Sequence, residues 1–360
     1  MRAPQMLAFC CSIVKQIILT DYTVALSSKK LLTFPPLCSI IKSYEKAFLC
    51  LKGVPKMSMK RFPDGARVCF VGDSLVARNQ YLPVIIDCYK QNFPGSGIRF
   101  FNCGVSGGTA KFAHDSFEND VLSCKPTHVV VAFGVNDSKR TRLEKPRSKE
   151  RYDFFLEWFE IYKKSLSALC EKVLASGCEL ILCTPAPYDE YTETPIPTFK
   201  GGYALLCEYA NFVRNLAKEK GYTLVDFHEC LTRALQVEEG PLFDADHVHP
   251  NIHGFYLMAK YFLAQQGLDA PAEGEIPAYF ADWREKLFVY RSINAAECMI
   301  IKDYSLPQEE KDRIVRDFLA AGKWSISYFE TISKRYLEMK DKEAELAREI
   351  AEIYDRDILF

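Results

Sequence analysis

The stretch FDADHVHPN at residues 243–251 contains two Asp/His pairs with the same spacing. Asp244 and His247 form one pair, and Asp246 and His249 form a second pair shifted by two residues. An imidazole oriented by a carboxylate can act as a general base toward a nucleophile, whereas clustered Asp and His side chains can also ligate zinc. The stretch therefore allows three interpretations: either pair as a base with its carboxylate, or all four side chains as a metal site.

Three further residues that could take part in acyl transfer follow apolar segments elsewhere in the chain. Ser74 lies in the tripeptide GDS, Gly107 in NCGVSGGT and Asn136 in GVND. Acyl transfer needs such groups, because a serine hydroxyl attacks only when an imidazole takes its proton. The oxyanion that then forms needs preorganised donors, which a glycine N–H and an asparagine amide can supply. These residues and one Asp/His pair supply the parts for ester hydrolysis.

Each of these motifs also has a purely structural interpretation. Asp or Ser after a strand commonly caps the next helix. Gly107 and Gly108 can form a tight turn, and Asn136 with Asp137 can be a capping pair. What favours catalysis is their combination, since the four motifs follow one another in order and each lies just past an element boundary.

Pro250 favours one register of the Asp/His stretch. A proline restricts the preceding residue to non-helical dihedrals and is well accepted at the first position of a helix. We therefore expect Pro250 to begin a helix and His249 to be the last loop residue, facing the sheet edge. This argument favours Asp246 with His249 over Asp244 with His247. The remaining histidines form no second cluster in the sequence, so we expect neither a metal nor another cofactor.

Five near-continuous apolar runs alternate with segments of helical periodicity. The predicted strands are 67–72, 98–104, 128–134, 179–185 and 223–227, and the clearest predicted helices are 151–176 and 203–220. Continuous apolar strands are typical of a parallel sheet covered on both faces. The alternation predicts βαβ units and a doubly wound parallel sheet. The ligand site of such a sheet lies at the carboxyl ends of its strands.

The two ends of the chain differ from this central pattern. Residues 1–60 carry a net charge of +7, from nine Lys and Arg against two acids, and we expect a poorly ordered or atypical extension rather than a signal peptide. Globular patterning begins just after Met57 and Met59, either of which we consider a candidate start. A linker near 268–279 leads to a helical segment, 275–360. Its last helix carries an apolar stripe from Phe329 to Ile353, which favours packing on its own domain, with an oligomer contact as the alternative.

The composition excludes several classes of protein. The formal net charge of −1 offers no global basic field for nucleic acid, and no apolar run reaches the length of a bilayer span. Fourteen cysteines without a single C-x-x-C pair argue against a zinc knuckle, and so many unpaired thiols favour a reducing compartment. We expect a cytoplasmic protein.

With its four motifs the sequence resembles the SGNH hydrolases, also called GDSL-type lipases or esterases. The resemblance spans about residues 66–267, through FVGDSL, NCGVSGGT, GVND and DHVHPN. It implies that Ser74 is the nucleophile and an oxyanion donor, that Gly107 and Asn136 complete the oxyanion hole, and that Asp246 and His249 are the orienting carboxylate and the base. His247, where the family often has a small residue, departs from the pattern.

The predicted protein is a three-layer α/β/α enzyme with a flavodoxin-like five-stranded parallel sheet. We expect a hydrolase domain over 61–270 and an additional C-terminal helical segment over 275–360. The expected activity is hydrolysis of small acyl esters of carbohydrates or polar metabolites through an acyl-enzyme on Ser74. Lipase or thioesterase activity, a non-catalytic binding or scaffold protein on this fold, and a metal-dependent hydrolase are the alternatives. The stretch 184–198 is expected to border the pocket.

Overall fold

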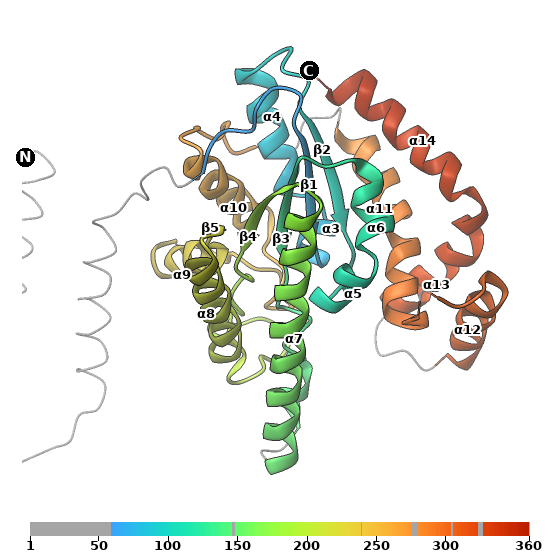
Figure 1. Cartoon of the computed structure of the whole chain (residues 1–360). Coiled ribbons are helices and arrows are strands. Elements are labelled where there is room, and N and C mark those ends of the chain that lie inside the picture. Colours follow the sequence, from blue (N-terminus) through green and yellow to red (C-terminus); the bar gives the residue numbers. More distant parts are fainter. Residues whose placement is uncertain are drawn as a thin grey trace, which may run out of the picture. The chain divides into compact units, whose positions relative to one another are not determined.

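Five short apolar segments form one parallel sheet in the order β2-β1-β3-β4-β5 (Figure 1). This is the strand order of flavodoxin-like folds, in which the ligand crevice lies between β1 and β3. The predicted fold class is confirmed, although β3, β4 and β5 each end two residues before the predicted end. The strands are β1 (Arg67–Gly72), β2 (Arg99–Gly104), β3 (His128–Ala132), β4 (Glu179–Cys183) and β5 (Thr223–Val225).

The structure, a computed structural model, describes residues 59–145, 148–238, 240–274, 280–303, 305–322 and 327–359. All of them belong to one compact unit, Pro55–Phe360. Residues 1–58 of the expected N-terminal extension, with Met57, lie outside the described residues. Within the described ranges, no helix combines the length and the apolar character that crossing a membrane requires.

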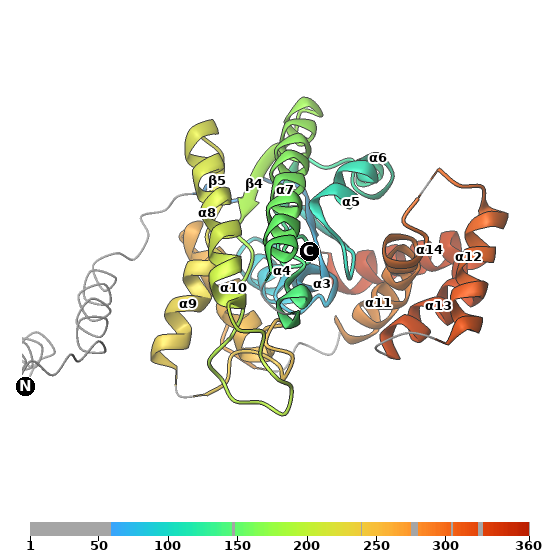
Figure 2. The ribbon, with the colours of Figure 1, turned by 90° about the horizontal axis from the view of Figure 1, so that it is seen from below.

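Helices cover both faces of the sheet (Figure 2). On one face α4, α9 and α10 pack against alternate strand residues, and on the other face α5 to α8 pack against the residues between them. The two predicted central helices are confirmed as α7 and α8. The helices of these layers are α4 (Leu82–Asn92), α5 (Ala110–Asp115), α6 (Phe117–Asp120), α7 (Lys149–Ala175), α8 (Gly202–Lys220), α9 (Phe227–Val237) and α10 (Ile252–Gln265).

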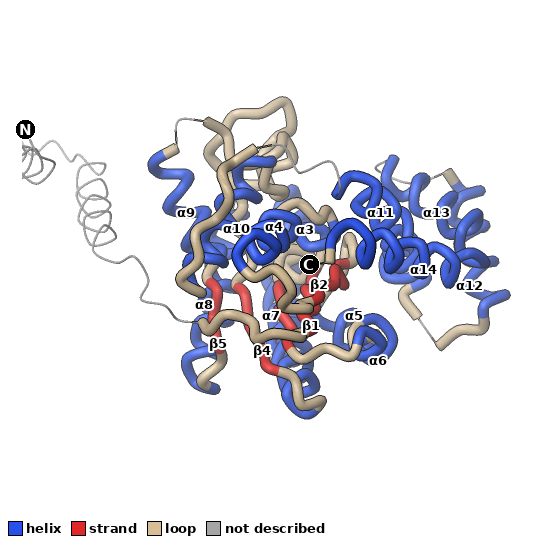
Figure 3. The backbone as a smooth tube through the Cα atoms, turned by 90° about the horizontal axis from the view of Figure 1, so that it is seen from above, coloured by secondary structure: helices blue, strands red, loops and turns tan. Residues whose placement is uncertain are grey.

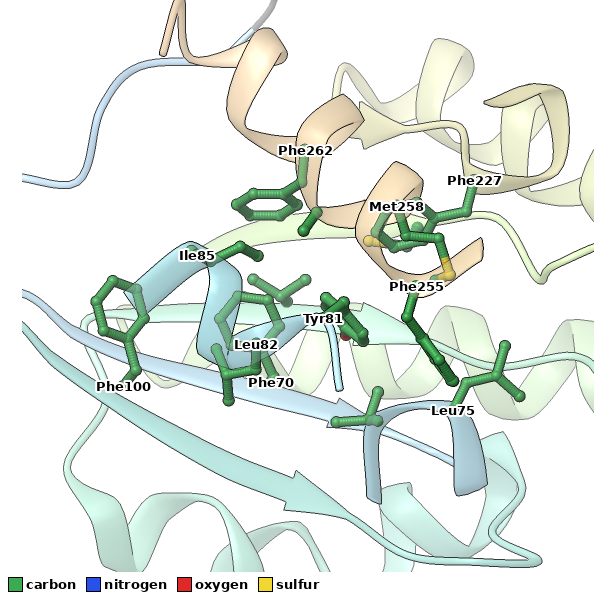
Figure 4. Close-up of a cluster of buried hydrophobic side chains, with 14 of the residues drawn as sticks. Phe70, Leu75, Tyr81, Leu82, Ile85, Phe100, Phe227, Phe255, Met258 and Phe262 are labelled. Atoms are coloured by element: carbon green, nitrogen blue, oxygen red, sulfur yellow. The ribbon is translucent and has the colours of Figure 1, made fainter. Parts of the chain in front are cut away.

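A cluster of aromatic side chains holds α4 and α10 against β1 (Figure 4). Phe70 of β1 contacts Tyr81 and Phe262, with ring centroids 5.9 Å and 5.6 Å apart, and Tyr81 stacks on Phe255 at 6.3 Å. All four rings are buried. Buried aromatic pairs of this kind add roughly 0.5–1.5 kcal/mol each beyond the area they bury. This packing fixes the strand that leads directly to Ser74.

The C-terminal segment is helical as predicted, but its last helix is interrupted. A short 3₁₀ turn, Lys340–Lys342, divides the apolar stripe between α13 and α14. Ile332 and Tyr336 before the turn and Ile353 after it are buried within the same compact unit. The helices of this segment are α11 (Ala281–Ala296), α12 (Gln308–Ala321), α13 (Ser327–Met339) and α14 (Glu343–Ile353).

These C-terminal helices lie beyond β2, the strand at one edge of the sheet (Figure 3). An edge strand leaves peptide groups that have no neighbouring strand to bond with. Here the Phe100 N–H donates to the Tyr354 hydroxyl at 2.8 Å, and the Asn102 carbonyl accepts from the Arg291 guanidinium at 2.6 Å and 3.0 Å. Side chains of the C-terminal segment therefore replace the missing strand.

We predict that Tyr354→Phe lowers the free energy of unfolding by about 1–3 kcal/mol, because it leaves a buried N–H without an acceptor. Urea denaturation measures this change. Tyr152, which is 63% exposed on α7, provides the control, and Tyr152→Phe should change the free energy of unfolding by less than about 0.5 kcal/mol. Equal effects of the two substitutions would contradict the role given to Tyr354.

Candidate active site

Ser74 lies where the chain turns from β1 into the short helix α3 (Ser74–Ala77). The carboxylate of Asp73 caps this helix by accepting from the Leu75 N–H at 3.0 Å. The predicted capping interpretation is therefore correct for Asp73, and the cap leaves the neighbouring serine at the sheet edge. A β-carbon at Gly104 would lie 2.4 Å from the Ala77 nitrogen, so only glycine lets α3 pack this closely on β2.

A chain of two hydrogen bonds joins Ser74 to the loop that follows β5. The Ser74 hydroxyl lies 2.7 Å from His249 Nε2, and His249 Nδ1 lies 2.5 Å from Asp246 Oδ2. Ser74 and His249 are 175 residues apart in the sequence. The three side chains predicted to form a catalytic triad thus lie in hydrogen-bonding order, with the imidazole between the hydroxyl and the carboxylate.

The Asp246 carboxylate is held in its charged form. Burial raises the pKa of Asp246. Hydrogen bonds from the His249 side chain and from the backbone N–H groups of Val248 and His249 lower this pKa by a larger amount, so that it lies well below the ordinary value. Both of those N–H groups donate to Asp246 Oδ1 at 3.0 Å. A charged carboxylate fixed in this way orients the imidazole and stabilises the imidazolium that forms when it accepts a proton.

Arg78 is a site residue that the sequence analysis missed. Its guanidinium lies 2.5 Å from the Asp244 carboxylate and 4.0 Å from Asp246 Oδ2. It thereby links α3, which carries the serine, to the loop that carries the histidine. No spacing rule connects residue 78 with residue 244, so only the tertiary structure reveals this pair. Asp244 is bound to Arg78 rather than to an imidazole.

His247 has a structural environment quite different from that of His249. It is 1% exposed, and its Nε2 lies 2.8 Å from the Thr194 hydroxyl and 2.7 Å from the Ile196 carbonyl. Its backbone has φ of +65°, a left-handed conformation that is uncommon outside glycine but tolerated by histidine. The two imidazoles of the stretch therefore have different partners, Ser74 for His249 and Thr194 for His247. His247 joins the Asp/His stretch to the stretch 184–198.

The prediction that Pro250 begins a helix is also wrong. Helix α10 begins at Ile252 with Asn251 as its cap, whose side chain accepts from the Gly254 N–H at 2.9 Å. Pro250 instead pairs with Phe243 in an isolated antiparallel bridge. The two ends of the stretch are thereby tied together, and the closed loop turns His249 toward Ser74.

The candidate oxyanion donors lie on the loops after β2 and β3. Gly107 adopts φ of +80°, and the Asn136 amide donates to the Gly108 carbonyl at 3.1 Å. The Val105 N–H donates to the Gly72 carbonyl at 2.9 Å, which holds the Gly107 loop beside the residues that precede Ser74. Among the described residues, no backbone carbonyl accepts a hydrogen bond from the N–H group of Ser74 or of Gly107.

Two buried carboxyl groups lie beneath these loops. Burial raises the pKa of Asp73 to about 6 and that of Asp137 to about 7, and the charge of Asp73 adds to the rise at Asp137. Hydrogen bonds from the Leu75 N–H to Asp73 and from the Ala110 N–H to Asp137 oppose these rises. Asp137 accepts from the Ala110 N–H at 2.9 Å, which ties the start of α5 to the loop after β3. The guanidinium of Arg140, also buried, lies close enough to Asp73 to favour its charged form.

The four side chains of the Asp/His stretch do not converge as metal ligands. His249 faces Ser74, His247 faces Thr194, and Asp244 is paired with Arg78. Within the described ranges, the group with clustered ligand atoms is a different one, made by the Cys69, Cys103 and Cys124 sulfurs within 4.8 Å of one another. Cys69 and Cys103 belong to the core on the α5–α8 face of the sheet, whereas the candidate base lies on the loop before α10.

A flavodoxin-like sheet with a serine, a histidine and a carboxylate joined at its carboxyl edge defines a hydrolase of ester bonds. Residues 70–256 match the GDSL-like Lipase/Acylhydrolase family. This match covers more than half of the chain, and the chain belongs to that family.

Individual relatives are more distant. An acetylxylan esterase of Geobacillus stearothermophilus is 27% identical over 220 residues, which cover 57% of this chain and 95% of that protein. An acetylxylan esterase of Xylanibacter ruminicola is 27% identical over 195 residues, which cover 48% of this chain and 37% of that protein. A solved structure described as a gut microbial diltiazem-metabolizing enzyme shares the fold over 84% of this chain and 98% of its own, with a TM-score of 0.67 at 16% identity.

We predict that replacing His249 lowers the activity, whereas replacing His247 lowers the stability. His249→Ala should lower kcat/KM for p-nitrophenyl acetate at least about a thousandfold, because the Ser74 hydroxyl loses its base. His247→Ala should retain activity within about tenfold but lower the free energy of unfolding by roughly 1–3 kcal/mol, since it loses buried hydrogen bonds at a left-handed position. If His247→Ala is the inactive variant, the assignment of the register is wrong.

The raised pKa of Asp137 predicts a pH dependence of stability. Because its folded pKa, about 7, lies above its unfolded value, the folded state holds the proton more tightly and stability is lost as pH rises from about 4 to about 7. Asp137→Asn should remove this loss, so the free energy of unfolding of the wild type should fall relative to the variant over that range. Urea titrations at several pH values measure the difference. Asp153→Asn, at an exposed position on α7, should run parallel to the wild type.

Proposed function

We propose that this chain is a serine esterase that removes acetyl groups from carbohydrate esters through an acyl-enzyme on Ser74. The observation that carries the proposal is the hydrogen-bond chain from Ser74 through His249 to Asp246. A hydroxyl at 2.7 Å from an imidazole nitrogen is within the range for direct proton transfer. In this proposal, residues 61–270 are the hydrolase domain and residues 275–360 are its helical extension.

The first half of the proposed reaction forms the acyl-enzyme. The Ser74 oxygen attacks the ester carbonyl while His249 Nε2 takes the hydroxyl proton, and Asp246 stabilises the resulting imidazolium. The N–H groups of Ser74 and Gly107 and the Asn136 amide receive the oxyanion. Each such donor contributes about a hundredfold to a thousandfold in turnover. His249 then gives its proton to the leaving alcohol oxygen as the carbon–oxygen bond breaks.

The second half returns the enzyme to its starting state. His249 takes a proton from water, whose oxygen attacks the acyl carbon, and the same three donors receive the second oxyanion. The bond to the Ser74 oxygen breaks, His249 returns the proton to that oxygen, and the acid is released. The strongly held charge on Asp246 supports the imidazolium in both halves.

Two observations favour an acetylated carbohydrate as substrate. The two relatives are described as acetylxylan esterases, and the first of them matches this chain over nearly its whole length. The partly exposed ion pair of Arg78 with Asp244 lies next to the candidate base, where the leaving alcohol has to lie. A charged pair with solvent-facing oxygens and N–H groups suits the hydroxyls of a sugar better than a lipid chain.

We predict that Ser74→Ala loses at least about a thousandfold in kcat/KM toward acetylated xylo-oligosaccharides and p-nitrophenyl acetate. Release of acetate and of p-nitrophenol measures the two activities. The variant should also lose labelling by a fluorophosphonate, which reacts with activated serines. Ser176→Ala, at an exposed serine near the opposite edge of the sheet, provides the control and should behave as wild type. Hydrolysis by Ser74→Ala at the wild-type rate would falsify the proposal.

A further inference from the structure

The C-terminal helices extend from the β2 edge to the loop that carries Gly107. Helix α11 continues into a π-helical turn, Glu297–Ile301, before the chain reverses. Such turns occur often at functional sites, because the extra residue displaces side chains from the regular helical positions. Met299 lies in this turn and is half-buried.

Met299 lies directly against Gly107. A β-carbon at Gly107 would be 2.5 Å from Met299 Sδ and 2.6 Å from Met299 Cγ, so the thioether occupies the space that any side chain there would need. Contacts this close leave no room for a solvent layer between the two residues. Gly107, whose N–H is proposed to receive the oxyanion, is therefore covered on its Cα side by the C-terminal segment.

Tyr328 makes a second contact with the same loop. Burial raises the pKa of Tyr328, while a hydrogen bond with the Ser106 side chain opposes this rise, and the charge of Arg78 lies near enough to lower the pKa as well. Tyr328 thus lies beside Ser106, the residue that precedes Gly107. Helix α13 and the π-helical turn contribute one residue each to this surface.

An apolar cluster fixes this surface in place. Val105 and Phe112, which flank the Gly107 loop, pack with buried residues of the C-terminal segment, among them Ile293 and Ile301. Met299 and Tyr328 belong to the margin of the same cluster. Side chains supported by a packed core keep their positions when a ligand approaches, whereas side chains on a free loop can move aside.

The chemistry of the proposed reaction determines what such a surface contacts. The tetrahedral carbon has four substituents: the Ser74 oxygen, the oxyanion, the leaving oxygen and the acyl carbon. The leaving oxygen has to lie at His249 Nε2, which protonates it, and the oxyanion lies at the N–H groups of Ser74 and Gly107. The acyl carbon takes the remaining direction, away from His249, and because it is bonded to the same carbon as the oxyanion it stays close to the Gly107 loop.

We propose that Met299 and Tyr328 form the wall of an acyl subsite that accepts an acetyl group and excludes longer chains. The proposal rests on the proposed serine esterase function and specifies the acyl half of its substrate. Met299 contacts the acyl group and sets its maximum length, and Tyr328 extends the same wall beside Ser106. Rejection of one extra methylene by a fixed apolar wall amounts to about tenfold or more in kcat/KM.

Chain-length profiles of Met299 variants test this subsite. The probes are p-nitrophenyl acetate, butyrate and hexanoate, which share one leaving group, so that their ratios report on the acyl side alone. Wild-type protein should prefer acetate over butyrate by about tenfold or more, and Met299→Ala should raise the butyrate-to-acetate ratio of kcat/KM by at least about tenfold. Met299→Leu, which conserves volume, should keep the wild-type profile. Met339→Ala, at another half-buried methionine of the same cluster, should keep it too.

The outcomes separate the subsite from the activity itself. An unchanged chain-length profile in a folded, active Met299→Ala protein overturns the acyl wall. The acyl wall is also overturned if Met299→Ala changes only the ratio of kcat/KM for acetylated xylo-oligosaccharide to kcat/KM for p-nitrophenyl acetate. Met299 would then contact the leaving group. Failure of the proposed function has another signature, in which the wild type neither hydrolyses any of the three esters nor reacts with a fluorophosphonate. Thermal unfolding of each variant shows that its profile comes from folded protein.

Discussion

The parallel register of three neighbouring strands is the constraint on which the site depends. Gly72 of β1 lies level with Gly104 of β2 and with Ala132 of β3, so these strands end at one edge. Parallel pairing forces the loop after each strand to begin at that edge, whichever helix intervenes. The serine, the glycine turn and the asparagine follow those three ends directly. Their proximity is a consequence of strand pairing.

The Asp/His loop, residues 243–251, does not follow a strand directly, and several interactions hold it against this edge of the sheet. An antiparallel bridge closes the loop at its ends, a left-handed residue turns it, and Asp246 accepts two backbone N–H groups within it. The buried imidazole of His247 joins it to the stretch 184–198, and Arg78 joins it to α3. A base that must lie within about 3 Å of a hydroxyl needs such support, because small displacements of catalytic groups cost much of the rate.

The C-terminal helices contribute both to the stability of the fold and to the surroundings of the candidate site. Through Tyr354 and Arg291 they satisfy the exposed peptide groups of β2, and the same helical segment continues to Gly107 through its π-helical turn. A segment that covers an unpaired edge has to stay in place for the sheet to remain satisfied. It can therefore also present a fixed surface to a ligand. The fold-level similarity to a solved structure over 84% of the chain includes part of this segment.

The sequence by itself determined the layers of the fold and the residues with the right chemistry. Continuous apolar runs and helical periods specified the parallel sheet, and four short motifs after strand or loop boundaries named Ser74, Gly107, Asn136, Asp246 and His249, whose catalytic roles stay predictions. Local patterns carry this information because burial and capping act over a few residues. Only the tertiary structure decided that Arg78 pairs with Asp244, that His247 supports a neighbouring loop, that Pro250 forms a bridge instead of a helix start, and that Met299 covers Gly107. Each of these contacts joins residues whose proximity arises from packing, which no local pattern encodes.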